Sequence, residues 1–392
     1  MNNMQSWRID NRELEYVSEL LKGGFPGRQN RSFTADLEKL FAEKFESKYA
    51  ISFTNGTATL HAALAAAGIG PGDEVIVPPL TMSSTSLAVL QAGAVPVYAD
   101  IDPDTFVMAA DTLEKVITPR TKAIMPVALY GLPPELDKIM YIARKHGLVV
   151  IEDDAQCFCG RVNGKLAGTF GDMASFSFQN SKHITCGEGG MVITNNRDLA
   201  EKLRRFSSLG YSCVGAVPGE SKIDKKLLVR YDFIRHVQMG FNYRLNEISA
   251  AVALAQLEKL DCFVNWRIRC AEVFAETIKG VPFLQAQKVH ENMINSYWAF
   301  AVKLTDDRID WQEFYDKFCS FGGDGFYGAW RLSYDEPFFS GIIPSEHKIC
   351  PNADMIQPRL MQFKTNYGNE EDIAREAEAL KNTIEYFRRK LA

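Results

Sequence analysis

The sequence predicts an α/β protein with a large domain on a mostly parallel central sheet flanked by helices, and a smaller C-terminal α/β domain. Between residues 49 and 195, short runs rich in Val and Ile alternate with helical patterns, which is typical of parallel sheets covered by helices. After residue 196 long amphipathic helices follow. At 392 residues the chain exceeds the length at which one hydrophobic core stops growing. We therefore expect a large domain over residues 1–255 and a small domain over residues 256–392.

The hydrophobic periodicity places the elements in chain order. Apolar or alternating runs predict strands at residues 49–54, 73–79, 95–102, 122–131, 148–156, 173–179, 189–195 and 296–304. Helical patterns predict helices at residues 56–70, 85–94, 109–117, 134–147, 197–210, 246–278, 310–322 and 370–391. Ligands of such sheets bind at the carboxyl ends of the strands, so reactive groups are expected in the turns that follow the strands.

Composition limits the partners. A net charge of −5 and a pI near 5.8, with basic residues scattered apart from short runs, argue against nucleic acid. The first 21 residues lack the basic and then apolar order of a signal peptide, and no apolar run could span a bilayer, so a cytoplasmic protein without membrane association is expected. The eight cysteines are too sparse for a disulfide framework. Only Cys157 and Cys159 lie close together, and no metal site is predicted.

The first candidate motif is a strand that ends in Asn55-Gly56-Thr57 and runs directly into a helix. Glycine lets the backbone approach a ligand, Thr57 offers a hydroxyl, and the free N–H groups at a helix start favour an anion such as phosphate. A capped helix start without any ligand gives the same pattern, so this motif alone leaves phosphate binding open.

The second motif is the apolar strand "LVVIEDDAQ", which delivers Glu152, Asp153 and Asp154 to its carboxyl end. A carboxylate placed there suits pairing with a buried cation or a protonated ring nitrogen, because an unpaired buried charge is costly. The alternative at this point is a helix cap or a surface acid in the turn.

The third motif places Lys182 and His183 side by side between an alternating strand and the glycine-rich stretch 187–190. A lysine that emerges from a strand end into an enclosed cleft loses its proton more readily and becomes a nucleophile suited to Schiff-base formation. On an extended stretch neighbouring side chains point opposite ways, so only one of the two is expected to face the cleft.

One cofactor, pyridoxal 5'-phosphate, carries a phosphate, a ring nitrogen and an aldehyde through which a protein can bind it. A helix N-terminus suits the phosphate, a carboxylate the ring nitrogen and a lysine the aldehyde. The chain resembles the DegT/StrS sugar aminotransferases in the sequence, order and spacing of its motifs. These motifs run from "NGTATLHAAL" through "IEDDAQ" and "SFSFQNSKHITCGEGGMVITN" to "GFNYRLNEISAAVALAQL". The resemblance implies a fold type I pyridoxal-phosphate transferase. It further implies transfer of an amino group from glutamate or glutamine to a keto sugar, mostly nucleotide-linked, for amino sugars of cell-surface polysaccharides or secondary metabolites.

Matched residue by residue, the resemblance implies which side chains surround the cofactor ring. Lys182 would bond to the cofactor and move the reacting proton, Asp153 would keep the ring nitrogen protonated, and Gln156 would lie against the ring or its 3'-hydroxyl. Most members carry an aromatic residue on the ring where this chain has Met82, whose thioether is adaptable but holds a ring less specifically.

The resemblance also implies a phosphate site shared between subunits. Gly56, Thr57 and the Ser177 hydroxyl would hold the phosphate, and Asn242 would reach it from the neighbouring chain. A homodimer with shared active sites is therefore expected. The segment 211–240 is irregular for its length, which indicates a functional loop, a partner contact or a tolerated surface insertion.

The small domain departs from the family at residues 323–339, where the usual substrate-lining run is absent. Tyr327, Trp330, Arg331 and Tyr334 could bind a sugar or phosphate by stacking and charge-assisted hydrogen bonds, or form a packed aromatic loop. An unusual acceptor therefore remains open, such as a keto-inositol or a small phosphorylated ketone.

Two other functions compete with amino transfer. Family members that carry histidine in place of the lysine are sugar dehydratases, and His183 raises that alternative. Lys182, five residues before Gly187, stands at the family's lysine position, which favours transamination. A non-catalytic sensor of a pyridoxal-like ligand would lack Lys182 or Asp153, and both are present.

Overall fold

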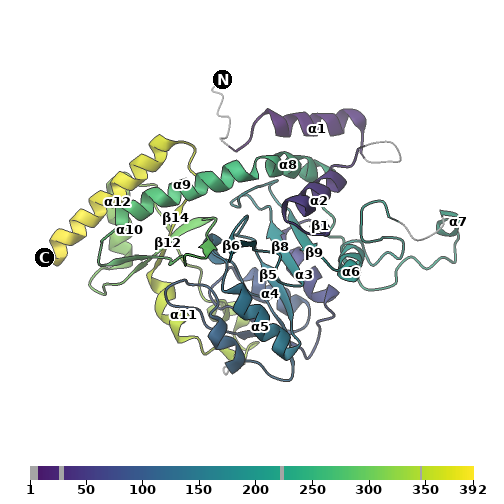
Figure 1. Ribbon diagram of the computed structural model, residues 1–392, viewed down its shortest axis with the longest axis horizontal. Helices are drawn as coiled ribbons and strands as arrows, with labels where there is room; N and C mark the ends of the chain where they lie inside the picture. The colour runs from purple at the N-terminus through teal and green to yellow at the C-terminus, as the bar shows by residue number, and fades with distance from the viewer. Residues whose placement is uncertain (1–7, 26–30, 221–224, 345–346) are drawn as a thin grey trace.

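A computed structural model of the chain describes residues 8–25, 31–220, 225–344 and 347–392. It confirms the predicted α/β architecture with a mostly parallel central sheet (Figure 1). A second, smaller sheet lies toward the C-terminus, and a long helix joins the two parts. The boundary between the two domains, placed between residues 255 and 256, stays a prediction. The joining helix, α9, begins at Leu260.

In the described part of the chain the central sheet has seven strands in the order β1-β9-β8-β5-β4-β2-β3. Strand β9 pairs antiparallel with both neighbours, and all the other pairings are parallel, so the remaining strands run in one direction. Their carboxyl ends therefore lie at one edge of the sheet. The strands are β1 (Tyr49–Phe53), β2 (Glu74–Val77), β3 (Val95–Tyr98), β4 (Thr121–Ile124), β5 (Val149–Asp153), β8 (Met173–Ser177) and β9 (Gly190–Thr194).

Helices cover both faces of the central sheet. Neighbouring residues of one strand enter different cores: Val75 and Val77 of β2 join one apolar cluster, whereas Ile76 joins another. Such strands are buried on both faces, which explains their nearly continuous apolar sequence. The helices of this part are α1 (Asn11–Gly23), α2 (Phe33–Lys44), α3 (Gly56–Ala66), α4 (Ser84–Gln91), α5 (Leu136–His146), α6 (Arg197–Ser207), α7 (Lys225–Leu228) and α8 (Glu247–Glu258).

The C-terminal part has its own sheet and helices. Strands pair in the order β10-β12-β14-β13, and a three-stranded sheet, β11-β6-β7, links this part to the first. The strands are β6 (Arg161–Val162), β7 (Lys165–Leu166), β10 (Leu284–Ala286), β11 (Met293–Ile294), β12 (Ala299–Leu304), β13 (Tyr327–Gly328) and β14 (Leu360–Lys364). The helices are α9 (Leu260–Ile278), α10 (Trp311–Ser320), α11 (Pro351–Ile356) and α12 (Glu370–Leu391).

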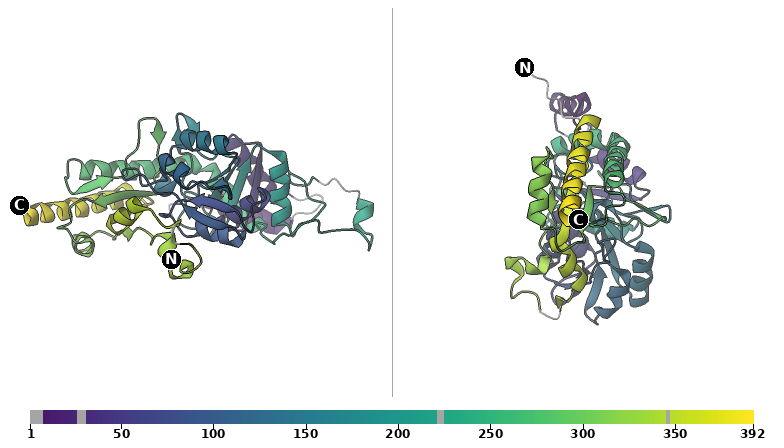
Figure 2. Two further views of the ribbon diagram at one scale, coloured as in Figure 1. Left: turned by 90° about the horizontal axis from the view of Figure 1, so that it is seen from below. Right: turned by 90° about the vertical axis from the view of Figure 1, so that its left-hand side faces the viewer.

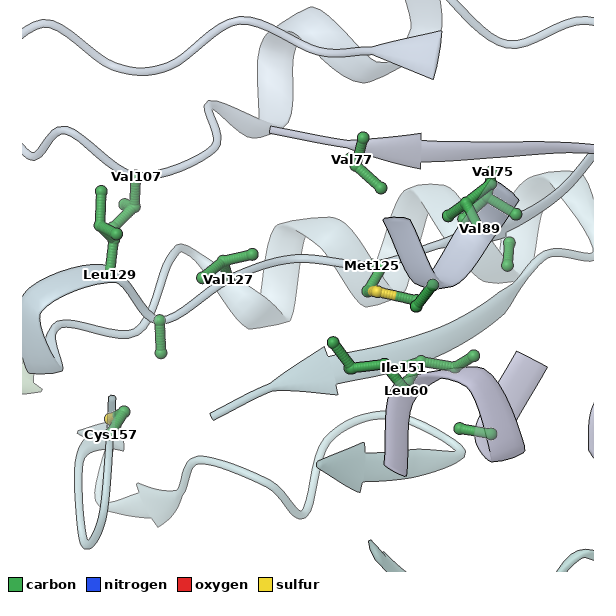
Figure 3. Close-up of a cluster of buried hydrophobic side chains, with 14 of the residues drawn as sticks. Leu60, Val75, Val77, Val89, Val107, Met125, Val127, Leu129, Ile151 and Cys157 are labelled. Atoms are coloured by element: carbon green, nitrogen blue, oxygen red, sulfur yellow. The ribbon is translucent and has the colours of Figure 1, made fainter. Parts of the chain in front are cut away.

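Apolar side chains from the central strands pack directly against the helices that follow them. Figure 3 shows Met125 and Ile151 from the sheet region beside Leu60 of α3 and Val89 of α4. All four are almost completely buried. This packing fixes the start of α3 against the strand ends, which matters for the site described below.

On the other face, five phenylalanines form an aromatic cluster. The ring of Phe41 on α2 lies 4.3 Å from that of Phe45 and 5.1 Å from that of Phe176 on β8, and Phe158 and Phe178 complete the group. The cluster packs α2 onto the strand that leads to the Lys182 turn. Helices α1 and α2 were not among the predicted elements.

The single helix predicted over residues 246–278 is wrong, because two helices, α8 and α9, meet at Lys259. The Lys259 ammonium lies 2.7 Å from a carboxylate oxygen of Glu13 on α1, and the backbone leaves helical geometry there. This contact with a distant helix accompanies the break, and the local apolar pattern gives no sign of either. The helix predicted at residues 109–117 is a short 3-10 turn, Ala110–Lys115.

The segment 211–240 extends away from the rest of the chain (Figures 1 and 2). Its residues 221–224 lie outside the described part. Seven apolar residues in the described part of the segment are exposed: Val217, Leu227, Val229, Tyr231, Ile234, Val237 and Met239. None of the helices in the described ranges is long and apolar enough to cross a bilayer.

We predict that Phe41→Ala lowers the free energy of unfolding by about 3–5 kcal/mol, because it leaves a cavity in the centre of the aromatic cluster. Urea denaturation measures the change. Phe338→Ala is the matched control, since 62% of that side chain is exposed, and it should change stability by less than about 0.5 kcal/mol. Equal effects of the two substitutions would contradict the packing role of Phe41.

Candidate active site

A cavity of about 640 Å³ opens at the carboxyl edge of the central sheet. Its walls come from the segments that follow β1, β2, β4, β5 and β8, with Trp298 and Trp330 contributed by the C-terminal part. Eight of the predicted site residues line it: Gly56, Thr57, Met82, Asp153, Gln156, Ser177, Lys182 and Trp330. Groups that lie more than 270 residues apart in the sequence, Gly56 and Trp330, thus meet in one space.

One end of the cavity is the start of α3. The Asn55 side chain caps the helix by accepting from the N–H of Ala58 at 2.8 Å, which leaves the N–H groups of Gly56 and Thr57 without an intrahelical partner. A Cβ at position 56 would lie only 2.8 Å from the Cβ of Ser177, so a glycine is required for α3 to approach β8. The N–H groups, the Thr57 hydroxyl and the Ser177 hydroxyl form a cradle for an anion.

The three consecutive acids after β5 have three different surroundings. Glu152 accepts hydrogen bonds from the backbone N–H groups of Gly168, Phe170 and Gly171 and thereby fixes that loop. Asp154 is buried on the same side of the strand, and burial raises the pKa of its carboxyl well above its usual range. Asp153, between them, points to the cavity.

The Asp153 carboxylate is held on both oxygens. The Thr85 hydroxyl donates to Oδ2 at 2.9 Å, and the backbone N–H of Ala155 donates to Oδ1 at 3.2 Å. Only 4% of Asp153 is exposed, and burial raises its pKa despite these two bonds. Such a group gains most from a cationic partner brought by a ligand, for example a protonated ring nitrogen. Thr85 has no distinctive sequence context and was missed.

Lys182 lies in a turn between β8 and β9, so the extended backbone assumed for it is wrong. Its own N–H bonds to the carbonyl of Gln179 at 2.9 Å, a turn contact that a strand would not make. Burial lowers the pKa of the Lys182 amine to about 8, against the opposing effect of Asp153. The Nζ atom lies 4.9 Å from the ring centre of Trp298, over its face.

His183 turns away from the cavity, as expected for only one of the two neighbours. It is completely buried, its Nε2 lies 2.9 Å from the carbonyl oxygen of Ser296, and its ring packs against Phe158. Burial lowers the pKa of His183 well below its usual range, so the ring is neutral. It acts as a packing residue and does not line the cavity.

Gln156 and Met82 lie on the walls as predicted for the ring contacts. The Gln156 amide oxygen accepts from the backbone N–H of Tyr130 at 2.8 Å, which leaves the amide nitrogen as the donor to a ligand. Met82 is 47% exposed, and its sulfur accepts from the N–H of Ser84. A ring over Met82 would therefore rest on a mobile thioether in place of a rigid aromatic face.

Two tryptophans form the wall opposite the sheet. The rings of Trp298 and Trp330 stack at 5.8 Å, and Trp330 also stacks on the buried ring of Tyr130 at 6.2 Å. The Trp298 indole N–H donates to the carbonyl of Ser181 at 2.9 Å, which ties the wall to the lysine turn. Trp298 was missed, because a contact across 117 residues leaves no local signal.

Three predicted site residues lie elsewhere in this chain. Tyr327 and Arg331 are exposed outside the cavity, and Tyr334 is packed with its hydroxyl on Asp354 at 2.7 Å. Asn242, predicted to act from a neighbouring subunit, is exposed and does not line the cavity of its own chain.

The donors present fit pyridoxal 5'-phosphate. The anion cradle at α3, the buried Asp153 carboxylate and the Lys182 amine match the phosphate, the ring nitrogen and the aldehyde in one cavity. Within the described ranges, no group of three or more His, Cys, Asp or Glu side chains could hold a metal ion.

Comparisons with known proteins agree with this geometry. The DegT/DnrJ/EryC1/StrS aminotransferase family matches residues 8–380. The GDP-perosamine synthase of Caulobacter vibrioides is 46% identical over 299 residues, 76% of each chain. Among solved structures, an aminotransferase from Psychrobacter cryohalolentis has a TM-score of 0.86 at 26% identity and covers 98% of each chain. The GDP-4-keto-6-deoxy-D-mannose-3-dehydratase of E. coli, with bound hydrated PLP, has a TM-score of 0.82 at 26% identity, covering 95% of this chain and 97% of that one.

We predict that Gly56→Ala weakens the binding of pyridoxal phosphate by about tenfold or more, because the added Cβ pushes the start of α3 away from Ser177. Titration of the cofactor-free protein by absorbance measures the dissociation constant. Gly70→Ala is the control, since the nearest atom to its Cβ would lie 3.9 Å away. Unchanged affinity in Gly56→Ala would show that the cradle is not the phosphate site.

Proposed function

The chain belongs to the DegT/DnrJ/EryC1/StrS aminotransferase family, and on this premise we propose that it transfers an amino group from glutamate or glutamine to a GDP-linked keto sugar. The chain is a pyridoxal-phosphate-dependent aminotransferase of nucleotide amino sugar biosynthesis. The observation that supports the site assignment is the convergence of the Lys182 amine, the Asp153 carboxylate and the start of α3 on one cavity.

Pyridoxal phosphate, when bound, supplies an aldehyde that carries the amino group and a ring that accepts electron density. Among the chain's own groups, the Lys182 amine is the proposed nucleophile and base. With the pKa of that amine lowered to about 8, a substantial fraction is neutral near pH 7.5 and can act as nucleophile and then as base. The Trp298 face beneath Nζ limits where the amine can move, so the proton is taken and returned at one position.

Asp153 is proposed to face the ring nitrogen. Its carboxylate is almost fully buried, and Thr85 and Ala155 hold both of its oxygens in place. Because these bonds fix the direction of the remaining lone pairs, a protonated nitrogen would meet a preorganised acceptor. The two neutral donors offset only part of the desolvation, so a cationic ligand stabilises this carboxylate further.

Two lines of support favour a GDP-linked keto sugar as the acceptor. A curated relative that shares 46% of residues is a GDP-perosamine synthase, and a structural neighbour is named for GDP-4-keto-6-deoxy-D-mannose. Trp298 and Trp330 also line the cavity, and an aromatic wall suits contact with the apolar part of a sugar. A keto-inositol or a small phosphorylated ketone is the second candidate, supported by the unusual sequence at residues 323–339.

Amino transfer is preferred to dehydration because of what the cavity contains. Lys182 lines it, whereas His183 is buried behind the turn against Phe158 and Ser296. For dehydration, His183 would have to act as the base in place of Lys182 and would need to reach the reacting atoms. The neutral, enclosed His183 has no path to them in this arrangement.

We also propose that two chains associate and share their sites. The segment 211–240 presents Val229, Tyr231 and Ile234 to solvent, and apolar surface of this kind favours a protein contact. Asn242, which immediately follows that segment, is exposed outside the cavity of its own chain. Contact with a second copy would bury the apolar side chains and could bring Asn242 to the partner's cradle.

The central test is amino transfer from glutamate to GDP-4-keto-6-deoxy-D-mannose, followed by the appearance of the amino sugar. Lys182→Ala should reduce turnover by about 10³-fold or more, because nucleophile and base are lost together. It should also abolish the visible absorbance that borohydride bleaches. Lys138→Ala, at a side chain that is 67% exposed, is the control and should keep both.

Turnover of Lys182→Ala near the wild-type rate would reject the assigned role. A wild-type enzyme that ignores the GDP sugar but aminates a keto-inositol or a phosphorylated ketone would reject only the acceptor. Replacing glutamate with glutamine in the same assay identifies the donor.

Shared sites predict complementation between two inactive variants. Asn242→Ala and Lys182→Ala should each be inactive or nearly so as homodimers. When the two are mixed under conditions that exchange subunits, a mixed dimer has one intact site and one doubly altered site, so activity should reappear. Mixing that restores no activity, with exchange verified by mass, would contradict a site built from both chains.

A further inference from the structure

The turn that carries Lys182 lacks the hydrogen bonds that regular structure would supply. Between the end of β8 and the start of β9, four successive carbonyl groups, those of residues 180–183, accept bonds from distant side chains. Buried carbonyl groups need such partners, because an unpaired one is costly. What satisfies them therefore decides the shape of the turn.

Two guanidinium groups satisfy these four carbonyls. Arg267 of α9 donates to the carbonyls of Ser181 at 3.0 Å and Lys182 at 3.1 Å. Arg8, just before α1, donates to the carbonyl of Asn180 at 2.8 Å and to that of His183 at 3.2 Å, and it also reaches Lys182. The Lys182 carbonyl thus accepts from both. The planar fork of Arg267 places one terminal nitrogen on both carbonyls of the turn and leaves the other terminal nitrogen for a second set of partners.

Arg267 also ties this turn to the tryptophan wall. Its second nitrogen donates to the carbonyl of Trp298 at 2.9 Å and to the hydroxyl of Thr365 at 3.1 Å. Trp298 is therefore linked to the lysine turn in two further ways. The indole N–H of Trp298 donates to the carbonyl of Ser181, and the Lys182 Nζ atom lies over the Trp298 ring. One side chain on α9 sets the positions of the amine and of the surface on which it rests.

The charge of Arg267 is buried without an acidic partner. The residue is 1% exposed, and in the described part of the chain no carboxylate is among the groups that shift its pKa. Burial lowers the pKa of Arg267 to about 9, which still leaves it a cation at neutral pH. A buried cation that only carbonyl and hydroxyl groups neutralise exerts its full field on its neighbours.

We propose that Arg267, together with Arg8, is a positioning residue of amino transfer: the two guanidinium groups fix the turn that presents Lys182, and the Arg267 cation bonds to the carbonyl of that lysine. The inference assumes the catalytic role of Lys182 given above. It assigns a function to two buried arginines that do not line the cavity.

The charges that face Lys182 come from three elements. Burial and Arg267 favour the neutral amine, whereas Asp153 at the end of β5 and Glu188 before β9 favour the ammonium. The Trp298 face also attracts the ammonium. Removing the Arg267 charge leaves the remaining acids unopposed, so the amine should hold its proton to higher pH.

The test uses the cofactor-free full chain, with no sugar or donor present. The fraction of Lys182 acetylated by acetic anhydride is measured by peptide mass spectrometry across pH. The wild-type midpoint is expected near pH 8, in line with a pKa of about 8. Arg267→Gln, whose amide can still donate to a carbonyl, should raise the midpoint by about one pH unit. A purely structural role would not shift it in this direction.

The conservative variant separates charge from geometry. Arg267→Lys keeps the cation but loses the fork, so the midpoint should stay near that of the wild type, while pyridoxal phosphate leaves the holoenzyme several-fold faster. Arg269→Met, on the same helix but 54% exposed, is the control and should change neither value. Circular dichroism and cooperative unfolding check that each variant folds.

An Arg267→Gln midpoint equal to that of Arg269→Met would overturn the charge effect. If Arg267→Gln does not fold, Arg8→Gln tests whether the guanidinium groups hold the Lys182 turn in place. Release of pyridoxal phosphate from Arg8→Gln that is no faster than from the wild type would overturn that part of the proposal. Because none of these readouts uses an acceptor, failure of the GDP-sugar assignment would leave them intact and is recognised separately.

Discussion

The site depends on one constraint, the common direction of every strand in the central sheet except β9. Parallel strands bring all their carboxyl ends to one edge, and the chain must turn there with backbone and side-chain polar groups that no strand pairs. The caps, acids and hydroxyls at the ends of β1, β5 and β8 therefore face one another, although Gly56 lies 121 residues before Ser177. The close approach of Gly56 to Ser177 makes this edge tight enough to cradle an anion.

Burial gives these groups their chemistry. In water Lys182 would be a solvated ammonium and Asp153 a solvated carboxylate, neither suited to exchange protons near neutral pH. Enclosure lowers the pKa of the lysine and raises that of the aspartate, so that both become responsive to what binds between them. The enclosure is completed by Trp298 and Trp330, which come from the C-terminal part of the chain. The cavity consequently needs both parts to exist as a reactive environment.

Much of the fold was predictable because the relevant signals are local. The strand that ends at Asp153 and the one that ends at Ser177 were placed correctly from their apolar runs, which report burial on both faces. The helix break at Lys259 was not predictable, because the apolar pattern continues across it and the ion pair that Lys259 forms with Glu13 spans 246 residues. The turn at Lys182 was mistaken for an extended stretch for the same reason: side chains far away in the sequence satisfy its carbonyl groups.

Short stretches of sequence were enough to assign the α/β class and to identify the groups that meet at the sheet edge, since strand periodicity, Gly56, Asp153 and Lys182 can each be recognised locally. How those groups are held became visible only in the folded chain. Thr85 on the aspartate, Trp298 beneath the amine and the guanidinium groups on the lysine turn act across long sequence separations, and a contact formed by folding leaves no pattern in either of the segments that make it.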